Sequence, residues 1–110
     1  MKQINQQQFE AYMQPGKTVL VEFWAPWCVY CRRLAPAMEA AAQAWDGKLE
    51  LVQLNIDEAP EVAQRQSIQV VPTLVLYQNG LAVDAITAPQ SRREIDEFIQ
   101  VALEAGKEQA

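Results

Sequence analysis

The sequence contains no histidine and only two cysteines, and both scarcities limit the sites that it can build. A zinc site usually needs four ligands, so Cys28 and Cys31 alone cannot complete one, and carboxylates or a second chain would have to supply the rest. A small fold stapled by disulfides needs several cysteine pairs. We therefore expect no bound metal and a hydrophobic core, which 110 residues, 50% of them hydrophobic, can form as one domain.

Positive charge is also scarce, because 9 Lys and Arg residues against 14 Asp and Glu residues leave a net charge of -5. The longest cationic runs are the dipeptides Arg32-Arg33 and Arg92-Arg93, which are too short to bind nucleic acid or an anionic membrane. No segment approaches the roughly 18 apolar residues of a membrane span, and residues 1–8 lack the apolar core of a secretory signal. We therefore expect a cytoplasmic protein without nucleic-acid or membrane partners.

Hydrophobic periodicity predicts strands that alternate with helices. Strand patterns, including a hairpin turn at Asn79-Gly80, occupy residues 18–24, 49–55, 73–77 and 81–86. Helical patterns occupy a short segment between Asn5 and Pro15-Gly16, residues 28–45, about 59–66, and a last helix capped by Ser91 and Glu94. Gly106 predicts the end of that helix and a polar tail at about 106–110. The order predicts an α/β fold with a central mixed sheet flanked by helices on both faces.

The two cysteines frame the segment Cys28-Val29-Tyr30-Cys31, which directly follows the first predicted strand. Positions i and i+3 share a helix face with Cβ atoms about 5 to 6 Å apart, somewhat beyond the roughly 3.8 Å of a relaxed disulfide. A strained disulfide is the labile, catalytic kind. As a structural bond it would add only about 2 kcal/mol, because the loop is so short. We therefore interpret the pair as a redox-active disulfide.

Position within the helix assigns the two cysteines different roles. Cys28 lies two residues after Pro26, where unpaired helix amides and the helix dipole stabilise a thiolate. Cys31 lies one turn further in and should be more buried. Cys28 is therefore the expected nucleophile, which forms a mixed disulfide with a target, and Cys31 the thiol that resolves it. Two incidental core cysteines are the alternative, but a C-x-x-C pair in a cytosolic protein favours redox chemistry.

Short motifs follow one another along the chain: Trp24-Ala25-Pro26-Trp27-Cys28-Val29-Tyr30-Cys31, Leu34-Ala35-Pro36, Leu54-Asn55-Ile56-Asp57, Val71-Pro72-Thr73 and Asn79-Gly80. In order and spacing they resemble the landmarks of the thioredoxin family, in a form related to the bacterial thioredoxins, and the resemblance covers about residues 9–103. It implies a thioredoxin fold in one domain over residues 1–110 and reduction of protein disulfides in cell redox homeostasis. It further implies a monomer with no bound cofactor, recharged by a flavin- and NADPH-dependent thioredoxin reductase.

The resemblance also implies roles for residues around the cysteines. Glu22 aligns with a buried acid beneath the pair; burial would raise its pKa toward neutrality and let it accept the proton of Cys31. Pro72 aligns with a cis-proline that faces the cysteines, and X-Pro is the bond type in which cis is affordable. An exposed Glu22 is one alternative, although its five apolar neighbours in residues 19–24 favour burial. A trans Pro72 is the other. The implied substrate-binding groove is lined by Trp27, Val29, Tyr30, Val71, Pro72 and Thr87.

Several positions depart from the common thioredoxin pattern. Val29-Tyr30 replaces Gly-Pro between the cysteines, so the reduction potential of the family cannot be carried over. Gln53 stands where many bacterial thioredoxins have a lysine near the buried acid, and Val70 and Thr87 stand where glycines are common. Two alternatives to a reductase therefore remain open: a more oxidising or isomerase-like enzyme, and a protein-binding or chaperone module that uses its cysteines little.

Overall fold

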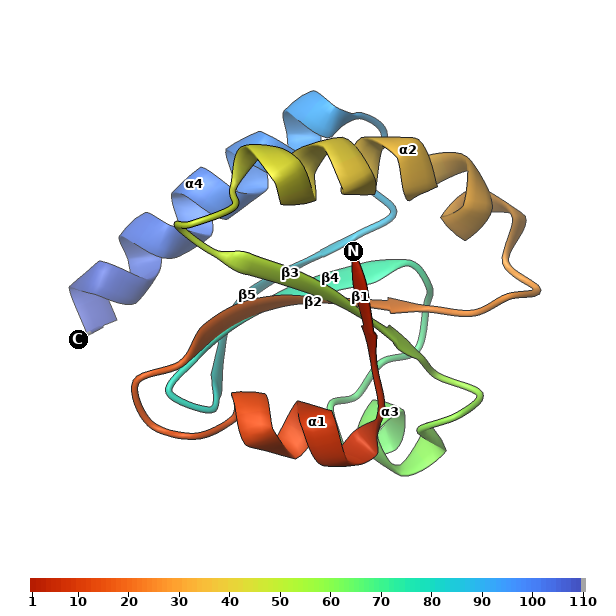
Figure 1. The fold of residues 1–110 in the computed structure, drawn as a ribbon, viewed down its shortest axis with the longest axis horizontal. Coiled ribbons are helices and arrows are strands. Elements are labelled where there is room, and N and C mark those ends of the chain that lie inside the picture. Colours follow the sequence, from red (N-terminus) through yellow and green to blue (C-terminus); the bar gives the residue numbers. More distant parts are fainter. Residues whose placement is uncertain (110) are drawn as a thin grey trace.

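A five-stranded mixed sheet forms the centre of the computed structural model, which describes residues 1–109 (Figure 1). Its strands are β1 (Lys2–Ile4), β2 (Thr18–Trp24), β3 (Glu50–Asn55), β4 (Thr73–Gln78) and β5 (Leu81–Thr87). They lie in the order β1-β3-β2-β4-β5; β1, β3 and β2 are parallel, and β4 is antiparallel to both neighbours. The predicted α/β fold with a mixed sheet is confirmed.

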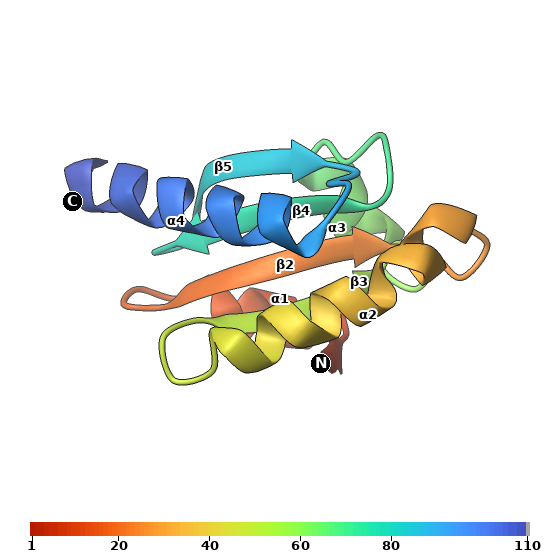
Figure 2. The same cartoon turned by 90° about the horizontal axis from the view of Figure 1, so that it is seen from above.

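Helices cover both faces of this sheet, as predicted. Figures 1 and 2 show α1 (Gln6–Tyr12) and α3 (Pro60–Arg65) on one face, and α2 (Val29–Ala44) and α4 (Arg92–Gln109) on the other. Each face has its own hydrophobic core, because successive side chains of a strand point to opposite sides. In β2, Leu20 packs in the α2/α4 core, whereas its neighbours Val19 and Val21 pack in the α1/α3 core.

The expected helix caps are formed at both ends of the chain. Asn5 Oδ1 accepts the Gln8 amide hydrogen at 2.8 Å, and Gln8 Oε1 accepts the Asn5 amide hydrogen at 2.9 Å, so α1 begins with a complete capping box. Ser91 Oγ likewise accepts the Glu94 amide hydrogen at 3.1 Å. The Glu94 carboxylate, however, accepts the amide hydrogen of Gln90, at 3.1 Å. Glu94 therefore caps the amide of Gln90, whereas the predicted capping box would have it cap the amide of Ser91.

The prediction that Gly106 ends the last helix is wrong. α4 continues through Gly106 to Gln109, so there is no separate tail from residue 106 within the described chain; Ala110 lies outside the described residues. Gly106 is buried, and a Cβ atom at this position would lie 2.6 Å from Gln78 Oε1. The glycine thus permits close packing of α4 against β4, and its occurrence there is not a stop signal.

Strand β1 was not predicted, because its sequence carries almost no pattern. Of its three residues only Ile4 is buried, which is too little to register as alternation. The strand forms because β3 offers a free edge: Lys2, Gln3 and Ile4 pair in parallel with residues 52–54. This pairing brings Gln3 opposite Gln53.

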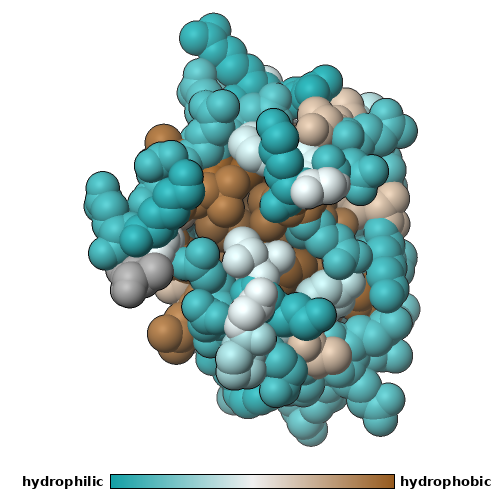
Figure 3. Space-filling view, turned by 60° about the vertical axis from the view of Figure 1, so that its left-hand side comes forward, coloured by the Kyte–Doolittle hydropathy of each residue, from teal (hydrophilic) through white to brown (hydrophobic). Residues whose placement is uncertain are grey.

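The two ends of the sheet lie beside different parts of the chain. Figure 3 looks at the end that holds the C-terminal part of α4, where hydrophilic residues cover most of the surface and hydrophobic residues show between them. The carboxyl ends of the parallel strands lie at the opposite end, where β2 leads into α2 (Figure 1). Cys28 lies at this second end, between β2 and α2.

Candidate active site

Cys28 is the N-cap of α2. The sequence predicted a helix from residue 28, but Cys28 has extended backbone angles, φ -84° and ψ 107°, and the helix begins at Val29. This conformation turns its side chain back over the first turn, where Cys28 Sγ accepts the amide hydrogen of Cys31 at 3.1 Å. A sulfur atom here takes the place of the oxygen of an ordinary capping residue. The free amides of the helix end therefore face Sγ and stabilise negative charge on it.

Both cysteines are free thiols and buried, with Cys31 4% exposed and Cys28 8% exposed. The pKa of the Cys31 thiol is raised to about 12, chiefly by burial and then by its hydrogen bond with Cys28 and the charges of Cys28 and Glu22. A hydrogen bond with the backbone of Ala25 opposes these effects. The Cys31 thiol therefore keeps its proton at neutral pH and needs a base before it can react.

Glu22 is a buried carboxyl group whose charge acts on the Cys31 thiol. It lies in the middle of β2 and is 1% exposed, as predicted. Its pKa is raised to about 7, chiefly by burial and also by the charge of Glu39, while a hydrogen bond from Gln53 opposes the rise. Gln53 Nε2 donates to Glu22 Oε1 at 2.6 Å, whereas Oε2 is buried with no hydrogen-bond partner in the described part of the chain. Glu22 can therefore gain or lose a proton near neutral pH.

Pro72 lies beside the cysteines, and the Val71–Pro72 peptide bond is cis. Val71 packs against the cluster of buried residues that holds both thiols, and its carbonyl oxygen lies 3.7 Å from Cys28 Sγ. The carbonyl of Pro72 accepts the amide hydrogen of Ala88 at 2.8 Å. Thr87, the residue before Ala88, is exposed at the end of β5, and its Oγ1 lies 3.2 Å from Thr73 Oγ1. The structure thus brings Val71, Pro72 and Thr87 together at one end of the sheet, where β4 begins and β5 ends.

Exposed apolar side chains stand next to Cys28 and to the cis-proline in the sequence. Trp27 is 63% exposed, Val29 52% and Val70 54%. Trp27 and Val29 flank Cys28 in the sequence, and Val70 lies two residues before the cis-proline. Trp27 is oriented by a hydrogen bond from its indole Nε1 to Asp57 Oδ1, at 3.2 Å. The sequence offered Asp57 as a family landmark but gave no sign of this contact.

The side chain of Tyr30 is held in place by a hydrogen bond. Its ring is half-buried, and its hydroxyl donates to the carbonyl oxygen of Pro89 at 2.8 Å. The hydroxyl therefore ties the first turn of α2 to the segment that enters α4. Because 59 positions separate the two residues, no local pattern could have predicted the contact.

The rest of the described chain supplies two further observations. Residues 1–109 contain no group of three or more Cys, His, Asp or Glu side chains placed to hold a metal ion. Within the same residues, every helix is too short or too polar to cross a membrane.

Comparison with known proteins gives one consistent result. The model of the family described as Thioredoxin matches residues 1–101. Thioredoxin 1 of a Nostoc strain is 38% identical over 82 residues, covering 74% of this chain and 77% of that protein. Thioredoxins of Alicyclobacillus acidocaldarius and Streptomyces clavuligerus are 38% and 39% identical, over 80% and 84% of this chain and 84% and 86% of their own lengths.

The matched region contains the whole site, from Glu22 through the cysteine pair to Pro72 and Thr87. Extensive sequence identity, the fold, and two thiols brought together at the start of a helix all lead to the same conclusion. The chain belongs to the thioredoxin family and is a thiol-disulfide oxidoreductase.

Proposed function

We propose that the chain reduces protein disulfides, with Cys28 as nucleophile and Cys31 as resolving thiol. The observation that carries this proposal is the N-cap geometry of Cys28, whose Sγ faces the first amides of α2 and accepts the Cys31 amide hydrogen. Cys28 is therefore the sulfur prepared to carry negative charge, whereas the thiol of Cys31 holds its proton. As a member of the thioredoxin family the chain acts on protein disulfides and needs no bound cofactor.

The reaction proceeds by two exchanges. The Cys28 thiolate attacks one sulfur of the target disulfide; the target S–S bond breaks, a mixed disulfide forms, and the other target sulfur leaves as a thiolate that takes a proton. Cys31 then loses its proton and attacks Cys28 Sγ. The Cys28–Cys31 disulfide forms, and the second target sulfur leaves. The target has gained two electrons and the chain has lost two.

Glu22 accepts the proton that Cys31 must lose. In the resting protein the pKa of Cys31 is about 12 and that of Glu22 about 7, which opposes the transfer. Two causes of the high Cys31 pKa, its hydrogen bond with Cys28 and the charge of Cys28, end when Cys28 enters the mixed disulfide. Formation of that intermediate therefore prepares Cys31 for deprotonation, which orders the two steps.

The target binds across the exposed apolar surface. Trp27 and Val29 flank Cys28 in the sequence and Val70 precedes the cis-proline, and a bound target would cover these exposed apolar side chains. Val71 lies against Cys28, Pro72 and Thr87 lie next to it, and Tyr30 holds the segment at Pro89. We assign these residues to substrate binding.

The wider setting follows from the family resemblance. We propose that a flavin- and NADPH-dependent thioredoxin reductase returns the oxidised pair to the dithiol, and that the protein works as a cytoplasmic monomer with one domain over residues 1–110. It acts in cell redox homeostasis and neither binds nucleic acid nor attaches to membranes.

Insulin reduction tests the proposal directly. With dithiothreitol as electron source, the wild type should precipitate insulin chains rapidly, and Cys28→Ser should lose this activity. Equal rates would overturn the thiol mechanism and favour a binding module. Equilibration of the Cys28–Cys31 pair with glutathione then settles the direction of electron flow: a potential near that of strong thiol oxidants would replace the reductase by an oxidising or isomerase-like enzyme.

A further inference from the structure

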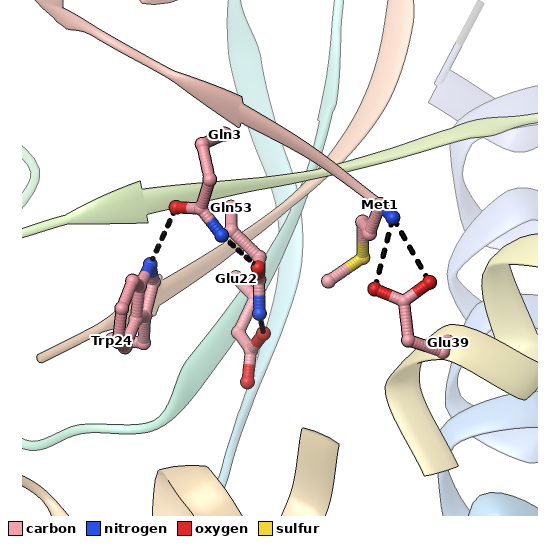
Figure 4. Close-up of polar contacts among 6 residues, drawn as sticks. All are labelled: Met1, Gln3, Glu22, Trp24, Glu39 and Gln53. Atoms are coloured by element: carbon pink, nitrogen blue, oxygen red, sulfur yellow. Dashed lines mark hydrogen bonds and ion pairs between the residues drawn. The ribbon is translucent and has the colours of Figure 1, made fainter. Parts of the chain in front are cut away.

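A chain of side-chain hydrogen bonds runs across three strands and ends on Glu22. Trp24 Nε1 donates to Gln3 Oε1 at 3.0 Å, Gln3 Nε2 donates to Gln53 Oε1, and Gln53 Nε2 donates to Glu22 Oε1 at 2.6 Å. Figure 4 shows the four side chains in this order. The chain starts at the exposed Gln3 and the half-buried Trp24 and leads to a carboxyl group that is 1% exposed.

Strand pairing explains why these side chains meet. Gln3 is the register partner of Gln53 across β1 and β3, and Gln53 is the register partner of Glu22 across β3 and β2. Directly paired residues point to the same face of a sheet. Trp24 lies two residues after Glu22 and therefore shares that face as well. The row belongs to the sheet itself and needs no loop to assemble it.

The indole at the start of the row decides its direction. A tryptophan N–H can only donate, so Gln3 must turn its oxygen toward Trp24 and its amide nitrogen toward Gln53. Gln53 then presents its oxygen to Gln3 and its own N–H to Glu22. Each amide has one donor end and one acceptor end, so a donor at the first position delivers a donor at the last.

The arrival of an N–H at Oε1 makes the two oxygens of Glu22 different. Oε1 is held as a hydrogen-bond acceptor whether the acid is charged or neutral, whereas Oε2 is buried without a partner in the described residues. In Figure 4 the free oxygen points away from Gln53. A proton bound by the acid therefore belongs on Oε2, because a proton on Oε1 would oppose the Gln53 donor.

We propose that Trp24, Gln3 and Gln53 form a directional relay that positions Glu22, holding Oε1 as an acceptor and reserving Oε2 as the atom that gains and loses the proton. The three are positioning residues that act through Glu22. For its catalytic meaning this proposal rests on the proton-accepting role proposed above, but the relay itself can be tested without any redox reaction.

The other groups around Glu22 do not supply an equivalent donor. On α2, the charge of Glu39 raises the pKa of Glu22, and the charge of Glu22 raises the pKa of Cys31. The amino group of Met1 contacts Glu39 at 2.9 Å. On β4, the register partner Leu74 is apolar, and the residues that α4 buries in this core are Ile95, Phe98, Ile99 and Ala102. The Gln53 N–H is thus the contact that lowers the pKa of Glu22 against its burial.

The test is a pH titration of the Glu22 carboxyl carbon by NMR in the full, reduced chain, with the resonance assigned through Glu22→Gln. In Gln53→Leu the donor is lost, and the pKa should rise by about one unit or more, as expected for a hydrogen bond to a charged group. In Trp24→Phe and Gln3→Leu the Gln53 amide is no longer held with its N–H toward Glu22. Each variant should therefore give a smaller rise in the Glu22 pKa. Gln7→Leu, at an exposed glutamine of α1, is the matched control and should leave the pKa unchanged.

Two results would overturn the relay. One is an unchanged Glu22 pKa in Gln53→Leu; the other is a rise in that variant with none in Trp24→Phe or Gln3→Leu, which would reduce the row to one local bond. If Gln53→Leu does not fold, the two variants at the outer end decide the question. The pH profile of insulin reduction should move in the same direction as the pKa. Failure of Cys28→Ser to lose activity would instead count against the proposed function and leave the titration valid.

Discussion

On the sheet face that α1 and α3 cover, β2 buries only apolar side chains. On the face that α2 and α4 cover, the same strand carries Glu22 and Trp24. The first face contains an aromatic group in which Phe9 lies 5.5 Å from Tyr77 and 6.2 Å from Phe23, measured between ring centroids. The second face also has a large apolar core around Leu20, and a smaller cluster of buried residues holds the two cysteines. Both faces thus supply an apolar core, but β2 buries a carboxyl group only on the second.

The largest expected effect of any substitution is on activity, at the reactive end of the second face. Cys28→Ser should reduce insulin reduction to the background rate, because serine cannot form the mixed disulfide. Its unfolding midpoint in urea should stay close to that of the wild type, since a serine hydroxyl can also cap α2. Cys31→Ser should instead accumulate a stable mixed disulfide with the target, detectable by mass spectrometry. Accumulation in Cys28→Ser and not in Cys31→Ser would reverse the assigned roles.

The next largest effect is on stability, at the first face. Phe9 is 1% exposed and packs against two other rings, so Phe9→Ala should lower the free energy of unfolding by about 3 to 5 kcal/mol. Urea unfolding followed by tryptophan fluorescence measures this loss. The rate of insulin reduction per folded molecule should remain that of the wild type. A large fall in that rate would mean that the two faces are coupled.

The third effect is a change in the free energy of unfolding with pH. The pKa of Glu22 is about 7 in the fold against 4.5 for the unperturbed group, so the folded state holds this proton more tightly than the unfolded state. Stability should therefore fall as the pH rises from about 4.5 to 7, by roughly 3 kcal/mol, and stay level above that. Glu22→Gln lacks this loss and should be the more stable protein above pH 7. Urea unfolding of both proteins across this range provides the measurement, and parallel curves would contradict the prediction.

The smallest effect concerns the contact between Tyr30 and Pro89. Tyr30→Phe removes only the hydroxyl that donates at 2.8 Å and should cost about 1 kcal/mol of stability. Tyr12→Phe removes a hydroxyl bond of the same length to Glu50, remote from the cysteines, and is the matched control. Insulin reduction should change in the Tyr30 variant and not in the Tyr12 variant. An equal response in both would show that the Pro89 contact does not shape the substrate groove.

Elements with strong local patterns were predictable from the sequence. The apolar run of β2 defined that strand to its exact ends, and the Asn79-Gly80 turn correctly indicated the β4–β5 hairpin. β1 was missed because pairing with an existing edge, and not its own pattern, makes it a strand. The end of α4 was mispredicted because the reason for Gly106 is a packing contact with Gln78, which cannot be seen locally.

The candidate site divides in the same way. Spacing and position alone pointed to Cys28 and Cys31, and the five apolar neighbours of Glu22 pointed to its burial. What the sequence did not reveal was how the acid is held. Gln53 was noted only as the absence of a lysine, and Gln3 was not noted at all, although both belong to the row of hydrogen bonds that ends on Glu22.

The sequence by itself determined the thiol pair, the buried acid and the alternation of strands and helices, because each is encoded by neighbours within a few residues. Only the tertiary structure decided that Gln3, Gln53 and Glu22 lie in one row, that Cys28 caps α2, and that Tyr30 reaches Pro89. Apart from the cap, these contacts join residues 31 to 59 positions apart. Strand register and helix packing set such distances, and neither can be read from the residues that they bring together.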